Sequence, residues 1–217
     1  MGPSCQHRIA MTEDTLTLSS LPLFPLGTVL FPGGELPLRV FEVRYLDLID
    51  KCHTAGAPFG VVGLRRGSEV QVAGAPEEQL ESIGTLAHIV SIERPQTGLL
   101  HVRCQGSQRF HIDRQKRLKH GLWVADVTMM ADDTRVAVPE DLEHTATALH
   151  QLRATLRERG AIGPDADDQV YEECGWVANR WCELLPLSAE IKQQLMTLEN
   201  PLLRLELVAD ILNRSGV

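Results

Sequence analysis

An apolar stretch that begins at Leu21 is interrupted by four prolines, Pro22, Pro25, Pro32 and Pro37. Each proline fixes its own φ and removes one backbone hydrogen-bond donor, so it is excluded from the ladder of a central strand. The strands between these prolines must therefore be short, bent or at the edge of a sheet.

The pattern becomes helical after Pro37. Apolar residues then recur at spacings of three and four, as on one face of a helix: Leu38, Phe41, Tyr45, Leu48, Ile49 and Cys52. The opposite face carries polar residues: Glu42, Asp47, Asp50 and Lys51. We therefore expect a pair of strands, turned at Gly33-Gly34, that leads directly into an amphipathic helix.

Short β-branched segments separated by turn residues fill the next part of the chain. They are FGVVGL (59–64), EVQVAG (69–74), TLAHIVSIE (85–93), LLHVRCQG (99–106), RFHIDRQ (109–115) and WVADVTMM (123–130). Their spacing favours a closed or nearly closed antiparallel sheet, since closure removes unpaired edges. Residues 95–98, Pro-Gln-Thr-Gly, predict a hairpin turn.

Helical periodicity begins near Pro139, which suits a first helical turn. The first apolar stripe is Leu142, Ala146, Leu149, Leu152 and Leu156, and the second is Val170, Cys174, Val177, Trp181 and Leu184 or Leu185. Ser188 is expected to cap a third helix, and Asn200-Pro201 to open a fourth. The sequence thus predicts a helical C-terminal part.

Three segments resemble the N-terminal domain of Lon proteases, the LON substrate-binding domain. They are LPLFPLGTVLFPGGELPL (21–38) followed by FEVRY (41–45), IGTLA (83–87) and VRCQGSQRF (102–110). The resemblance implies an α+β fold, with a PUA-like β-barrel domain and one packed helix at 19–131 and an all-α helical bundle at 132–217. Residues 1–18 are expected to form a flexible leader, and the chain to be a stand-alone member of the family.

Composition and charge are those of a globular chain without a membrane segment. The N-terminus lacks the apolar core of a signal peptide, so we expect a cytoplasmic protein. The net charge is −8, and the excess lies in residues 131–217, with 8 basic and 16 acidic side chains. Five cysteines without close CxxC spacing argue against a disulfide framework and a zinc knuckle.

The sequence does not carry a motif that predicts catalysis or cofactor binding. The phosphate-binding motif GxxxxGK[ST] and the Ser-Lys peptidase pair of a complete Lon protease are absent, and the sequence contains no Gly-Lys dipeptide. The histidines do not form an HxxxH or HExxH motif. We therefore expect no enzyme activity, no metal and no cofactor.

The resemblance implies a partner instead: unfolded or extended polypeptide, with a separate protease or ATPase as a further candidate. Six residues form the candidate binding site: Phe24, Phe31, Leu36, Arg39, Glu42 and Arg44. These residues have a structural interpretation as well as a functional one. The apolar residues Phe24, Phe31 and Leu36 also suit a core strand, and Glu42 and Arg44 also suit the start of a helix. Strand addition beside the barrel is the functional interpretation.

An RNA-binding module is the alternative function. It rests on a basic run within residues 109–120: Arg109, His111, Arg114, Lys116, Arg117, Lys119 and His120. Most of these residues are expected in solvated turns, with Phe110 and Trp123 as the nearby stacking aromatics. An acidic helical part is a poor platform for nucleic acid, so this partner is not favoured.

Overall fold

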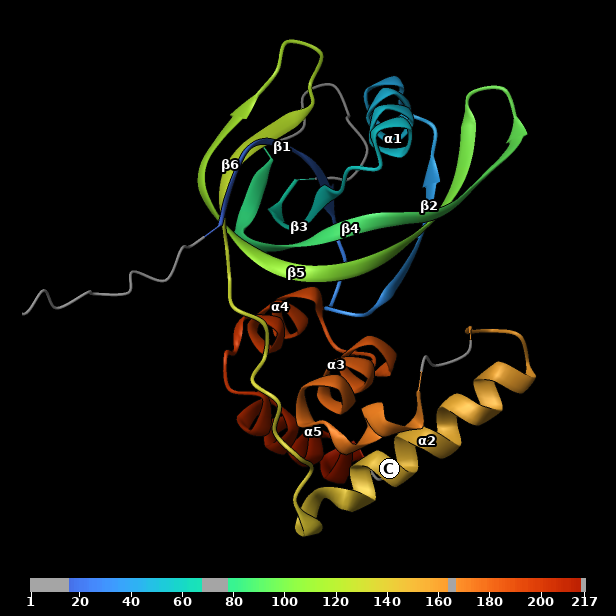
Figure 1. Ribbon diagram of the computed structural model, residues 1–217, viewed down its shortest axis with the longest axis vertical. Helices are drawn as coiled ribbons and strands as arrows, with labels where there is room; N and C mark the ends of the chain where they lie inside the picture. The colour runs from blue at the N-terminus through green and yellow to red at the C-terminus, as the bar shows by residue number, and fades with distance from the viewer. Residues whose placement is uncertain (1–15, 68–77, 164–166, 216–217) are drawn as a thin grey trace, which may run out of the picture.

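The computed structural model describes residues 16–67, 78–163 and 167–215, and they form an α+β fold (Figure 1). Six strands lie in the first part of the chain: β1 Thr17–Leu26, β2 Glu35–Val40, β3 Phe59–Arg66, β4 Gln79–Gln96, β5 Leu99–Arg117 and β6 Trp123–Met129. The helices are α1 Val43–Ala55, α2 Glu143–Glu158, α3 Cys174–Leu184, α4 Ala189–Thr197 and α5 Pro201–Ser215. Two 3-10 turns, Glu140–Leu142 and Asp168–Glu172, precede α2 and α3.

The sheet has the order β2-β5-β4-β3-β1-β6, and β6 also pairs with β5. This extra pairing closes five strands on themselves, while β2 stands outside the closed path and pairs with β5 alone among the described strands. The sheet is therefore not a simple barrel. It is also not wholly antiparallel, because β1 and β3 run parallel.

Two of the expected strand boundaries were wrong. Segments 99–106 and 109–115 form one continuous strand, β5, which is long enough to pair with β2, β4 and β6 in turn. The expected strand at 69–74 lies outside the described residues. The hairpin turn at 95–98 is confirmed, since β4 ends at Gln96, β5 begins at Leu99 and Gly98 has a φ of 79°.

The predicted helix begins later than its apolar spacing indicated. Leu38 lies in β2, where residues 35–40 alternate between exposed and buried, and α1 starts only at Val43. Phe41 is 54% exposed, so it does not belong to the buried face of the helix. The spacing of three between Leu38 and Phe41 was a coincidence, because the period-two pattern of β2 decides the local structure.

The helices follow the predicted order, and the last two, α4 and α5, begin at the predicted side-chain caps. The Ser188 hydroxyl accepts a hydrogen bond from the Ile191 amide at 3.3 Å, and the Asn200 side chain accepts from Leu202 and Leu203. The second predicted apolar stripe does not lie on a single helix, because Val170 belongs to the 3-10 turn before α3 and Cys174, Val177 and Trp181 belong to α3.

The boundaries of the two parts differ in detail from the expectation. Strand β1 begins at Thr17, inside the segment 1–18 that was expected to be a leader, and residues 1–15 lie outside the described part of the chain. An isolated β-bridge joins Ala137 to Glu173 in the C-terminal part. Its description as an all-α bundle stays a prediction.

The loop between β1 and β2 connects the sheet to the helices, as Figure 1 shows for the blue segment beside α3 and α4. Phe31 is fully buried among apolar side chains of the helical part. The Pro32 carbonyl accepts a hydrogen bond from Arg180 of α3 at 2.9 Å. Gly33, with a φ of 72°, turns the chain back into β2.

A buried ionic cluster also joins these two parts. The Asp133 carboxylate accepts hydrogen bonds from Arg109 of β5 at 2.8 Å and from Arg204 of α5. Arg109 also donates to the carbonyls of Met196 and Leu198. Both arginines are nearly inaccessible to solvent, so their charges depend on these partners.

Candidate functional site

A groove of about 280 Å³ lies between the end of β1 and the outer edge of β2. We call it the β2 groove. Its lining residues are Phe24, Leu26, Thr28, Leu36, Pro37, Leu38, Arg39, Val40, Phe41, Glu42 and Tyr45. The groove is thus built from the proline-interrupted stretch and from the first residues around α1.

The two strands that bound the β2 groove leave backbone edges without a partner strand in the described structure. The pairing of β1 with β6 ends at Leu23, so residues 24–26 pair with β3 on one side only. Among the described strands, none lies beside the outer edge of β2. An unpaired edge of this kind is the surface to which an extended chain adds as a further strand.

The alternation of an antiparallel pair shows which groups of β2 face outward. The Gly106 amide of β5 donates to the Gly34 carbonyl, so residues 34, 36, 38 and 40 direct their backbone groups toward β5. Glu35, Pro37 and Arg39 therefore direct theirs toward the outer edge of β2, and Pro37 and Arg39 line the groove. The backbone of Pro37 faces away from β5, so the sheet loses no hydrogen bond by the absence of an amide proton there. This explains why β2 accommodates a proline.

Aromatic side chains form the floor of the β2 groove. Phe24 stacks on Tyr45 with ring centroids 4.1 Å apart, and the Phe59 ring is tilted against Phe24 with centroids 6.1 Å apart. Burial raises the pKa of Tyr45 to about 12, an effect that the neighbouring Arg44 charge partly opposes. The phenol is therefore neutral at physiological pH, and the floor is uncharged.

The structure brings four of the six candidate residues together. Phe24, Leu36, Arg39 and Glu42 line the β2 groove. Phe31 does not, because it is fully buried in the core of the helical part. Its apolar character did not reveal which of the two cores it would join.

Arg44 also lies outside the groove lining and is 6% exposed. Its guanidinium donates to the Gly121 carbonyl at 2.8 Å and to the Glu42 carboxylate at 3.1 Å, and it lies over the Tyr45 ring. These contacts hold the start of α1 against the turn between β5 and β6. Arg44 therefore has a structural position behind the groove, and the sequence did not distinguish it from its exposed neighbours.

Seven groove residues were not among the sequence candidates: Leu26, Thr28, Pro37, Leu38, Val40, Phe41 and Tyr45. The sequence could have identified Phe41 as a groove residue, because the period-two alternation of residues 35–40 ends just before it. An aromatic side chain that follows such a strand and is 54% exposed is available for contact with a partner.

Comparison with known proteins gives the same assignment as the motifs. A family model for the substrate-binding domain of ATP-dependent protease La (LON) matches residues 20–214. This chain belongs to the LON substrate-binding domain family. The crystal structure of a Lon N-terminal domain protein from Xanthomonas campestris is 30% identical, with a TM-score of 0.69 over 89% of this chain and 98% of that one.

Complete Lon proteases match this LON domain over a limited part of their length. Lon protease 4 of Sorangium cellulosum is 32% identical and Lon protease of Anaeromyxobacter dehalogenans is 28% identical, each over 89% of this chain. The chain spans 24% and 23% of these two proteases, respectively. The relationship therefore concerns their substrate-binding part.

The basic run gives no continuous RNA surface on this LON domain. Arg109 is buried in the ionic cluster, and the residues from 111 to 117 lie within β5 and not in turns. Phe110 is fully buried, and the Trp123 indole donates to Glu78 at 2.6 Å, so neither ring is available for stacking on a base. The relatives described above lend no support to the RNA alternative.

The described residues of the LON domain offer few groups for chemistry. Burial raises the pKa of Cys52, Cys104, Cys174 and Cys182, so these thiols are protonated and poorly nucleophilic at neutral pH. Within the described ranges there is no group of three or more potential metal ligands. Over the same ranges, no helix combines the length and the apolar character needed to cross a bilayer.

Proposed function

We propose that this LON domain recognises unfolded or extended polypeptide, without catalysing a reaction on it, by adding the polypeptide as a strand to the outer edge of β2. The β2 groove carries this proposal, since it joins an unpaired strand edge to an apolar floor and holds four of the six candidate residues. The family to which the chain belongs is described as the substrate-binding domain of ATP-dependent protease La, which supports a role in recognition.

The groups along the groove suit weak binding with little sequence preference. The outward amides and carbonyls of Glu35 and Arg39, with the Pro37 carbonyl, recognise a backbone and not a particular side chain. Phe24 and Phe41 supply apolar surface for one or two side chains of the bound segment. A domain that selects unfolded chains needs this tolerance.

The sheet and the helices have different parts in this proposal. The β-rich part, residues 19–131, carries the binding surface, and the acidic part, residues 132–217, supports it through Phe31 and the Arg109 cluster. A separate protease or ATPase in the cytoplasm would receive the bound polypeptide. The chemistry of the groove itself requires no cofactor.

Hydrogen exchange with an unfolded probe tests the proposal. We expect reduced and alkylated lactalbumin to slow amide exchange in residues 24–39 of the full chain, and a fluorescent form of the probe to bind about equally well at low and physiological salt. A single-stranded RNA serves as the control, because phosphate binding weakens steeply with salt. Unchanged exchange in residues 24–39 at saturating probe would refute binding at this groove.

A further inference from the structure

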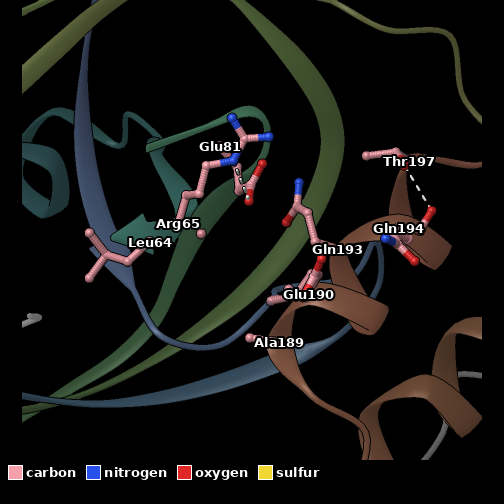
Figure 2. Close-up of a pocket in the computed structure, with 10 residues that line it drawn as sticks. Leu64, Arg65, Glu81, Ala189, Glu190, Gln193, Gln194 and Thr197 are labelled. Atoms are coloured by element: carbon pink, nitrogen blue, oxygen red, sulfur yellow. Dashed lines mark hydrogen bonds and ion pairs between the residues drawn. The ribbon is translucent and has the colours of Figure 1, made fainter. Parts of the chain in front are cut away.

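A second cavity lies between the sheet and α4 (Figure 2). It has a volume of about 380 Å³. Five of its lining residues carry the argument: Val29, Arg65, Glu81, Glu190 and Gln193. Figure 2 shows Arg65 and Glu81 on the sheet side, facing Glu190 and Gln193 on the helix side.

Gln193 presents an unsatisfied acceptor to this cavity. The residue is 7% exposed, and its side-chain nitrogen donates to the Ile83 carbonyl at 2.9 Å. This bond fixes the orientation of the amide, because only the nitrogen can donate to a carbonyl. The oxygen Oε1 is buried and has no hydrogen-bond partner among the described residues, so they offer this acceptor no donor.

The charges around the cavity favour a cationic donor. Two carboxylates, Glu81 and Glu190, line it together with one cation, Arg65. The Arg65 side chain is 68% exposed and lies 3.7 Å from the Glu81 carboxylate, which is a loose ion pair. The cavity thus has an excess of negative charge beside a buried acceptor, and Val29 adds an apolar residue to its lining, whereas the Leu64 side chain points away from the helix side (Figure 2).

We propose that this cavity binds the guanidinium group of an arginine side chain that belongs to a bound polypeptide. An arginine has an apolar stem, which suits Val29, and a planar head with several donors, which can reach Gln193 Oε1 and a carboxylate together. That the arginine comes from a polypeptide rests on the proposed function. The preference of the cavity for a guanidinium group does not.

The first experiment uses a small probe. N-acetyl-arginine amide is titrated into the full chain, and the Gln193 side-chain amide signal is followed by NMR; N-acetyl-citrulline amide is the neutral isostere. We expect the arginine probe to shift this signal and the citrulline probe to bind at least about tenfold more weakly. Absence of a shift with the arginine probe would overturn the proposal, and Oε1 would then be a site for water only.

Variants locate the binding. Gln193→Met is expected to lower the affinity for the arginine probe about tenfold, and Glu190→Gln to lower it about twofold to fivefold. The matched controls, Gln151→Met and Glu206→Gln, alter exposed residues on α2 and α5 and are expected to have no effect. Equal effects of the variants and their controls would contradict this site.

Gly63→Ala provides an independent variant if Gln193→Met does not fold. Its new methyl group would lie 3.3 Å from Gln193 Oε1 and 3.1 Å from the Glu81 Cγ atom, which narrows the cavity without removing a charge. We expect this variant to exclude the arginine probe. Retention of full affinity would overturn the placement beside Gln193.

Two peptides separate this proposal from the β2 groove. An unfolded peptide with one arginine and its citrulline counterpart should protect residues 24–39 equally, while the arginine peptide alone shifts the Gln193 signal. If N-acetyl-arginine amide binds but the two peptides shift the Gln193 signal equally, the proposal that the bound arginine belongs to a polypeptide is wrong. If neither peptide protects residues 24–39, strand addition at β2 fails while the guanidinium site stands.

Discussion

Burial sets the acid–base behaviour of the thiols. Cys182 is fully buried in α3, and desolvation raises the pKa of its thiol from 9.0 to about 12. The pKa in the folded state therefore lies above that in the unfolded state. Its contribution to stability is complete below pH 9 and is lost as the pH rises toward about 12.

We therefore expect the free energy of unfolding to fall from about pH 9 toward about pH 12, with a slope that approaches about 1.4 kcal/mol per pH unit for each such thiol. Urea denaturation at several pH values measures this slope. The variant Cys182→Ala should be less stable overall because of its cavity, but its slope should be smaller. Parallel pH profiles for the two proteins would contradict the buried thiol as the cause.

Strand β2 illustrates how one element can be both part of the sheet and open to a partner. Residues with odd numbers expose side chains and direct backbone groups outward, while Leu36, Leu38 and Val40 are buried. Pro37 shows that proline is accepted at an outward position. Arg39 lies two residues after Pro37 and has the same outward backbone orientation, so a proline can be introduced there as a test.

Arg39→Pro removes one outward amide donor, and Arg39→Ala removes only the side chain. If polypeptide adds to β2 as a strand, the proline variant should bind a fluorescent unfolded probe about threefold to tenfold more weakly than the alanine variant. Fluorescence anisotropy measures this difference, and urea denaturation checks that both variants stay folded. Equal affinity of the two variants would argue against hydrogen bonding to this edge.

The whole molecule depends on contacts between its sheet and its helices. Desolvation lowers the pKa of Arg109, and Asp133 opposes this shift by favouring the charged form. Because Asp133 also contacts Arg204, its carboxylate is shared by β5 and α5. Removal of this charge would leave two buried guanidinium groups without their counterion.

Asp133→Asn is therefore expected to lower the free energy of unfolding by about 3 kcal/mol, as when a buried ion pair loses one partner. The neighbouring exposed residue provides the control, since Asp132→Asn removes the same charge at the surface and should cost under about 1 kcal/mol. Denaturation in urea compares the two variants. Similar losses would show that the cluster does not join the two parts.

The sequence determined the elements that depend on near neighbours. The helical C-terminal part, the caps at Ser188 and Asn200 and the hairpin near Gly98 follow from local periodicity and turn chemistry, and the motifs in residues 21–110 indicated the LON family. These features involve residues a few positions apart, whose geometry is set by the backbone itself.

Only the tertiary structure decided which residues are accessible. It directed Phe31 into the helical core, buried Arg109 and Arg44 behind partners distant in the chain, and left the edge of β2 open. It also placed Gln193 beside Ile83, which lies 110 positions away. The physical reason is that burial and strand pairing depend on contacts between remote segments, which local patterns do not encode.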